Sequence, residues 1–115
     1  MDLGINSLSL AVKDIKKSKE FYETLGFRAI PDGGSVEEKW LILVNGETKI
    51  GLFEGMFPNN IITFNPKNAR AIYNKIADAE FEIVSASKTI EDDSGACNFM
   101  LTDPDGNQIL FDQFE

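Results

Sequence analysis

Few side chains in this sequence are able to do catalytic or metal-binding chemistry. The chain has no histidine, and Cys97 is the one cysteine among 115 residues. Histidine is the commonest general base and transition-metal ligand, so its absence excludes Ser-His-Asp and Cys-His catalysis and imidazole zinc sites. Cys97 alternates with Phe99 and Leu101, which indicates a small buried side chain and not a nucleophile. Any metal chemistry would have to rely on carboxylate oxygens.

The charge balance narrows the class of partner. The 19 acidic residues outnumber the 11 basic ones, which gives a net charge of −8. An acidic surface repels phosphate backbones and anionic membranes, so we expect no nucleic acid and no membrane as partner. The negative charge favours a cationic small molecule as ligand, or it serves solubility alone. The run Glu91-Asp92-Asp93 is typical of a solvated loop and not of a cation site. Nothing in the sequence indicates a bound cofactor, so we expect none.

The expected compartment is the cytoplasm. A single cysteine cannot form an intramolecular disulfide, and nothing in the composition requires an oxidising environment. No apolar run approaches the roughly 18 residues of a membrane span. The first residues also lack the basic start and apolar stretch of a signal peptide.

The chain length is that of one domain, residues 1–115, and the hydropathy pattern divides it into two modules, 1–55 and 56–115. Alternating and helical periodicities predict the order β-α-β-β-β in each module, an α+β fold. The predicted strands are 5–12, 27–30, 38–44 and 49–53, then 60–64, 81–86, 96–102 and 108–114. Residues 31–35 and 88–95 are predicted loops, and 55–59 is a linker.

Two amphipathic helices complete the repeat. The first is capped by Asp14 and runs to about Leu25, with the apolar face Ile15, Ser18, Phe21, Tyr22 and Leu25. The second is predicted to start with Asn65 as the cap and Pro66 in the first position, with the apolar face Ala69, Ile72, Tyr73 and Ile76. The turn signals Asn45-Gly46 and Asp103-Pro104-Asp105-Gly106-Asn107 each join the last two strands of a module.

Two segments carry a family resemblance. They are residues 10–18 (LAVKDIKKS) with Phe21-Tyr22 and Leu25-Gly26-Phe27, and residues 103–109 (DPDGNQI). With them the chain resembles the vicinal oxygen chelate superfamily, which includes glyoxalase I, extradiol dioxygenases and bleomycin-resistance proteins. The resemblance implies two βαβββ modules that form a curved mixed sheet around a groove. It also implies a homodimer.

The same resemblance implies four groove-facing strand positions at which the family's enzymes place metal ligands, usually His or Glu. In this sequence those positions are occupied by Ser7, Gly51, Ile61 and Leu110, none of which supplies a carboxylate or an imidazole. Two acidic residues lie near these positions. Asp112 shares a strand face with Leu110, whereas Glu54 points to the face opposite Gly51.

Strand alternation extends the predicted groove surface to a mainly apolar set with sparse polar groups, which is typical of a small-molecule pocket. The predicted ligand-binding residues are Ser7, Ser9, Trp40, Lys49, Gly51, Phe53, Ile61, Thr63, Leu110 and Asp112. Several of them have a structural alternative. Gly51 could be a kink in the sheet, Trp40 a core or dimer contact, and Lys49 an edge-strand gatekeeper.

Three functions follow from these residues. The favoured one is a non-enzymatic protein that binds a small organic ligand, in the manner of bleomycin-resistance proteins that sequester a cationic drug. The second is a metal-dependent lyase or glyoxalase-like enzyme that uses Glu54 and Asp112 as shifted ligands. The third is an interaction module whose groove is filled by its own side chains.

Overall fold

The computed structural model describes all residues from 1 to 115 and confirms the repeated element order. The first module consists of β1 (Ile5–Val12), α1 (Ile15–Thr24), β2 (Arg28–Ser35), β3 (Trp40–Asn45) and β4 (Thr48–Glu54). The second consists of β5 (Ile61–Asn65), α2 (Ala69–Asp78), β6 (Ser85–Ala86), a short 3-10 helix (Lys88–Glu91), β7 (Cys97–Thr102) and β8 (Gln108–Gln113). No helix is both long enough and apolar enough to cross a membrane.

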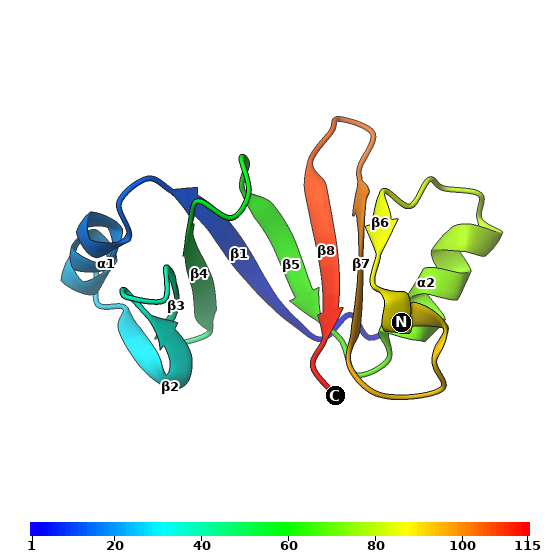
Figure 1. The fold of residues 1–115 in the computed structure, drawn as a ribbon, viewed down its shortest axis with the longest axis horizontal. Coiled ribbons are helices and arrows are strands. Elements are labelled where there is room, and N and C mark those ends of the chain that lie inside the picture. The colour runs from blue at the N-terminus through cyan, green and yellow to red at the C-terminus, as the bar shows by residue number, and fades with distance from the viewer. The chain divides into compact units, whose positions relative to one another are not determined.

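The chain forms two compact units (Figure 1). The N-terminal unit is Ser7–Asn60, and the C-terminal unit joins Met1–Asn6 to Ile61–Glu115. The strand orders are β2-β3-β4-β1 and β5-β8-β7-β6. In each unit one pair, β1 with β4 or β5 with β8, is parallel and the other pairs are antiparallel, so both units contain a mixed sheet.

The core of the N-terminal unit lies between α1 and one face of its sheet. Leu41 and Leu43 of β3, Ile50 and Leu52 of β4 and Ile15 of α1 are buried together. Because strand side chains alternate, the neighbours of these residues on β3 and β4 lie on the opposite face of the sheet. That opposite face carries the residues predicted to bind ligand.

The core of the C-terminal unit is aromatic. Phe99 stacks on Phe111 with ring centroids 5.0 Å apart, and Tyr73 of α2 meets Phe99 edge-on at 5.3 Å. Ala69, Ile72, Tyr73 and Ile76 all pack here, which confirms the predicted apolar face of α2. Cys97 is buried in the same cluster, as expected for a small apolar side chain.

The predicted apolar face of α1 is wrong in part. Ile15 is buried and Tyr22 packs against the core, but the side chains of Phe21 and Leu25 are 61% and 56% exposed. Ile15 and Tyr22 are seven residues apart and therefore lie on one line along the helix. Phe21 is one residue away from that line, about 100° around the helix, and Leu25 is already the C-cap.

Three local predictions are corrected by the structure. Residues 31–35, predicted as a loop, belong to β2, whose register shifts between Ala29 and Gly34 as in a bulge. The cap of α2 is Asn68, which accepts a hydrogen bond from the Ala71 N–H at 3.1 Å. Asn65 instead donates to the Asp112 carbonyl. Of the predicted strand 81–86, Ser85–Ala86 form the strand that pairs with β7, and the Val84 N–H donates to the Met100 carbonyl at 2.8 Å.

The remaining boundaries agree with prediction to within one or two residues, apart from the 3-10 helix inside the predicted loop 88–95.

Candidate ligand-binding surface

Strand register brings several predicted site residues together on the N-terminal unit. Ser9 of β1 lies beside Gly51 of β4, which lies beside Ile42 of β3. In the rows on either side of this one, Phe53 lies opposite Trp40 and Lys49 lies opposite Val44. All of these side chains stand on the face away from α1, because Leu41, Leu43, Ile50 and Leu52 occupy the other face. Ser7 and Ser9 are both 7% exposed.

Two aromatic side chains on this face lie over glycines. A Cβ added to Gly51 would stand 2.5 Å from Phe53 Cε2 and 3.1 Å from Ile42 Cδ1. A Cβ added to Gly34 would meet the Trp40 carbonyl oxygen first and would stand 2.7 Å from Cδ2 of the Trp40 indole. The Phe53 ring therefore fills the space above Gly51, whereas both the backbone and the indole of Trp40 lie against Gly34.

Phe57 extends this surface beyond the end of β4. Its ring centroid is 5.3 Å from that of Phe53, with the two planes tilted by 47°. We call Trp40, Ile42, Phe53 and Phe57 the aromatic strip. Sequence alternation from Trp40 could have identified Ile42, but nothing in the sequence indicated that Gly34 supports the indole, because Gly34 was expected in a loop.

The C-terminal unit carries the other predicted residues. Ile61 and Thr63 of β5 lie beside Gln108 and Leu110 of β8. Ile109 and Phe111 pack into the core, so Leu110 and Asp112 lie on the opposite face of β8. Ile61 is 4% exposed and Thr63 is 6% exposed.

The residues at the four positions that the resemblance assigns to metal ligands do not fit a divalent cation. Ser7, Gly51, Ile61 and Leu110 offer one hydroxyl group and hydrocarbon, whereas a hard cation needs several charged oxygens around it. No group of three or more His, Cys, Asp or Glu side chains lies close enough together to hold a metal ion. At Gly51 the space is taken by the Phe53 ring.

Glu54, the nearest carboxylate on β4, is engaged in holding the fold. Its Oε1 accepts a hydrogen bond from the Ile15 N–H at 3.0 Å, and its Oε2 lies 2.7 Å from Lys39 Nζ. The hydrogen bond from Lys39, with that from the Ile15 N–H, lowers the pKa of Glu54. The same contact raises the pKa of Lys39. Glu54 therefore joins the start of α1 to the end of β4.

The Asp103–Asn107 turn is likewise structural. Asp103 Oδ1 accepts hydrogen bonds from the N–H groups of Asp105 and Asn107, and Oδ2 accepts one from Asn107 Nδ2. These bonds lower the pKa of Asp103, and the Asn107 side chain contributes most. Gly106 has a φ of 87°, as the turn prediction requires.

A family comparison agrees with this architecture. Residues 4–111 match the model of the Glyoxalase/Bleomycin resistance protein/Dioxygenase superfamily. The chain therefore belongs to this superfamily, which confirms the resemblance and the predicted glyoxalase-like α+β fold. None of the curated proteins matches the sequence significantly.

Solved structures share the fold at low sequence identity. A glyoxalase/bleomycin resistance protein/dioxygenase superfamily member from Vibrio splendidus 12B01 has a TM-score of 0.67 and 18% identity, over 94% of this chain and 97% of that one. The structure of an NAD-dependent benzaldehyde dehydrogenase from Legionella pneumophila has a TM-score of 0.73 and 20% identity, over 96% of this chain and 99% of that one. Methylmalonyl-CoA epimerase from Mycobacterium tuberculosis has a TM-score of 0.70 and 12% identity, over 100% and 93%. These likenesses show the fold alone.

Proposed function

We propose that this protein binds a small organic molecule and does not convert it, with the aromatic strip as the main contact surface. The observation that carries the proposal is the Phe53 ring lying over Gly51. The family resemblance assigns a metal ligand to position 51, and a hydrocarbon ring covers that position. Such a surface favours contact with another ring or an apolar body.

The charge of the chain supports a cationic ligand. A net charge of −8 raises the local concentration of cations, and aromatic faces attract cations directly. Lys49 and Ser9 supply polar groups beside the strip for orientation. We therefore propose a planar aromatic cation, either a drug or a metabolite, as the class of ligand.

The test uses the fluorescence of Trp40, the one tryptophan in the chain. Proflavine, a planar aromatic cation, and bleomycin are titrated by calorimetry, and Trp40 quenching is followed in parallel. We expect binding in the range of roughly tens of micromolar. Phe53→Leu should weaken it about fivefold, because one ring contact contributes about 1 kcal/mol. Phe81→Leu, which changes an exposed phenylalanine of the other unit, is the control. Absence of heat and of quenching with both probes would overturn the proposal.

A metal-dependent activity built on Glu54 and Asp112 is the alternative. It requires Glu54 to give up its bonds to Ile15 and Lys39, and no observation favours this. Elemental analysis of the purified protein tests it, together with assays after addition of Ni²⁺, Zn²⁺ or Mn²⁺. One equivalent of bound metal would support this alternative against the binding function.

Homodimerisation and a cytoplasmic location also stay predictions. The family resemblance implies the first, and the charge and cysteine content favour the second. Sedimentation velocity at several protein concentrations tests the assembly state, and cell fractionation tests the location.

A further inference from the structure

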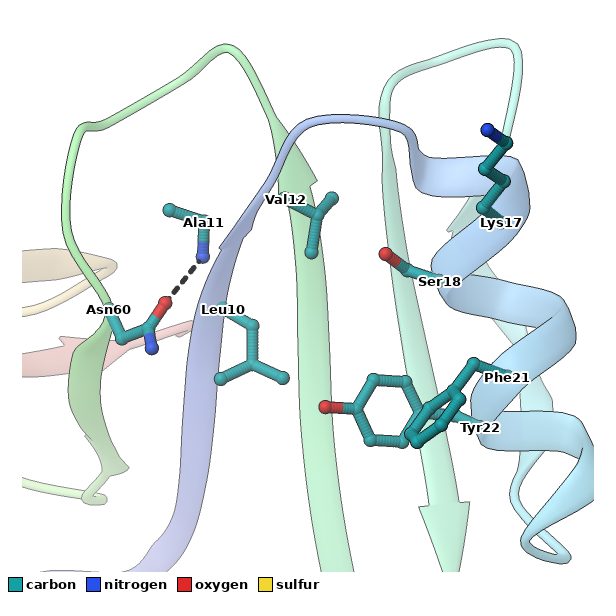
Figure 2. Close-up of a pocket in the computed structure, with 8 residues that line it drawn as sticks. All are labelled: Leu10, Ala11, Val12, Lys17, Ser18, Phe21, Tyr22 and Asn60. Carbon is teal, nitrogen blue, oxygen red and sulfur yellow. Dashed lines mark hydrogen bonds between the residues drawn. The ribbon is translucent and has the colours of Figure 1, made fainter.

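A cleft lies on the helix side of the N-terminal unit, away from the aromatic strip. It opens between α1 and the end of β1 and has a volume of about 370 Å³, which lies in the lower range for small-molecule sites. Figure 2 shows the residues that line it. They are Leu10, Ala11, Val12, Lys17, Ser18, Phe21, Tyr22 and Asn60.

One side of the cleft is apolar and well ordered by its contacts. Leu10 and Val12 pack against the core cluster of the unit. The Tyr22 ring is held edge-on between Phe21 and Phe27, with centroid distances of 5.2 Å and 5.6 Å. Phe21 remains 61% exposed at the rim. An aromatic or branched apolar body can therefore enter the cleft and bury hydrocarbon that water now covers.

The wall of the cleft that α1 forms also offers hydrogen-bond donors. In Figure 2 the hydroxyl groups of Ser18 and Tyr22 both point away from α1 and toward the strands. Lys17 lies on the first turn of the same helix, where its side chain points upward in Figure 2, and it makes no ion pair, whereas Lys19 pairs with Glu23. At the opposite wall, Asn60 Oδ1 already accepts the Ala11 N–H at 2.9 Å, so Asn60 closes the cleft.

Lys17 is the charged side chain among the residues that line this cleft. Residues 13–23 hold four lysines and three acidic residues (Asp14, Glu20 and Glu23), so this segment carries a net charge of +1 in a chain whose net charge is −8. The N–H groups at the start of α1 already have carboxylate acceptors, since Asp14 accepts from the Lys17 N–H and Glu54 accepts from the Ile15 N–H. The ammonium of Lys17, and not the helix start, is therefore the group that would attract an anion.

We propose that the cleft between α1 and β1 binds a small organic anion with an aromatic body, such as an aryl carboxylate. The ring lies against Leu10, Val12 and Tyr22, and the carboxylate accepts from Lys17. The Ser18 and Tyr22 hydroxyls are the remaining donors along its length. This site differs from the aromatic strip both in its place and in the charge of its ligand, so it does not depend on the function proposed above.

The experiment is a titration with 2-naphthoate followed by ¹H–¹⁵N NMR of the full chain. Two probes with the same ring, neutral 2-naphthalenemethanol and cationic 2-naphthylmethylammonium, isolate the effect of charge. We expect shifts at Ala11, Val12, Ser18 and Tyr22, and affinities that fall in the order anion, neutral, cation. Lys17→Gln should weaken the binding of naphthoate about fivefold, as expected for the loss of one exposed ion pair, and so bring its affinity closer to that of the neutral probe.

The matched control is Lys16→Gln, which removes the same charge from an exposed neighbour outside the cleft. It should leave naphthoate affinity nearly unchanged. Tyr22→Phe keeps the ring and removes one hydrogen-bond donor. It should reduce the affinity for each of the three probes by less than Lys17→Gln reduces the affinity for naphthoate. Spectra of each variant without probe verify folding.

Several results would overturn the proposal. Equal losses for Lys17→Gln and Lys16→Gln would mean a diffuse charge effect. Shifts confined to Trp40, Ile42 and Phe53 would place naphthoate on the aromatic strip. Shifts at Phe21 and Leu25 that depend on protein concentration without probe would show that a second copy of the chain covers the cleft. If proflavine and bleomycin do not bind the aromatic strip while naphthoate still binds the cleft, the function proposed above is rejected and the cleft proposal stands.

Discussion

Glu54 and Gln113 do the same structural work in the two units. Each is the last residue of its unit's final strand, and its Oε1 accepts a hydrogen bond from the first residue of the helix. The Ile15 N–H donates to Glu54 at 3.0 Å, and the Ala69 N–H donates to Gln113 at 2.7 Å. The free N–H groups at a helix start need such partners. The two units therefore connect the end of the final strand to the start of the helix in the same way, although the side chains that do so differ.

Removal of the Gln113 side chain should destabilise the C-terminal unit. Gln113 is buried, and its Nε2 also donates to the carbonyls of Gly95 and Glu115. Gln113→Ala leaves the buried Ala69 N–H without an acceptor, so we expect a loss of about 1–3 kcal/mol in the free energy of unfolding. Urea denaturation followed by circular dichroism measures it. Asn74→Ala on the exposed surface of α2 is the control, and an equal effect of both variants would contradict the assignment.

Glu54 should make the stability of the fold depend on pH as the pH falls below 4.5, the ordinary pKa of a glutamate. Because its pKa in the folded chain lies below the ordinary value of 4.5, its contribution is present at neutral pH. That contribution is lost as pH falls from this value through the lower folded pKa. Glu54→Gln keeps an acceptor for the Ile15 N–H but loses the ion pair with Lys39.

We therefore expect the difference in melting temperature between wild type and Glu54→Gln to be largest near pH 7 and to shrink toward pH 3. Thermal denaturation across this range tests the expectation, with Glu20→Gln on the exposed surface of α1 as the matched charge change. A difference that stays constant over the whole range would show that the Lys39 contact does not stabilise the fold.

The Phe53 ring and the absence of a side chain at Gly51 should be energetically coupled. Gly51→Ala places a Cβ within 2.5 Å of Phe53 Cε2 and so forces the ring to move. We expect Gly51→Ala to cost about 1–2 kcal/mol in the wild type and clearly less in a Phe53→Ala background. Unfolding of the four proteins in the double-mutant cycle measures the coupling. A coupling of zero would mean that the ring does not rest on position 51.

Asn107 should control the titration of Asp103. Its side chain is the largest cause of the lowered Asp103 pKa. Asn107→Ala should therefore raise this pKa toward its ordinary value of 3.8, although the backbone N–H of residue 107 can still donate. Carbon-detected NMR titration of the Asp103 carboxyl measures the change. Asn98→Ala, at an exposed position of β7, should leave the pKa of Asp103 where it is.

The amino-acid sequence by itself determined the order of the elements and the faces of the strands. Alternation along β3, β4 and β8 separates core residues from the others, because successive strand side chains point to opposite faces whatever the neighbours are. The absence of histidine likewise limits the available ligand chemistry before any folding. These are local or compositional properties.

Only the tertiary structure decided which residues meet. The carboxylate of Glu54 was a candidate metal ligand in the sequence, yet it is bound to Ile15, 39 positions away, and to Lys39. Trp40 lies against Gly34, although its strand partner is Ser35, because the register of β2 shifts between Ala29 and Gly34. Phe21 lines the cleft beside α1 because it lies off the line of Ile15 and Tyr22. Such contacts depend on strand register and helix orientation, which are set by packing between distant segments and not by local periodicity.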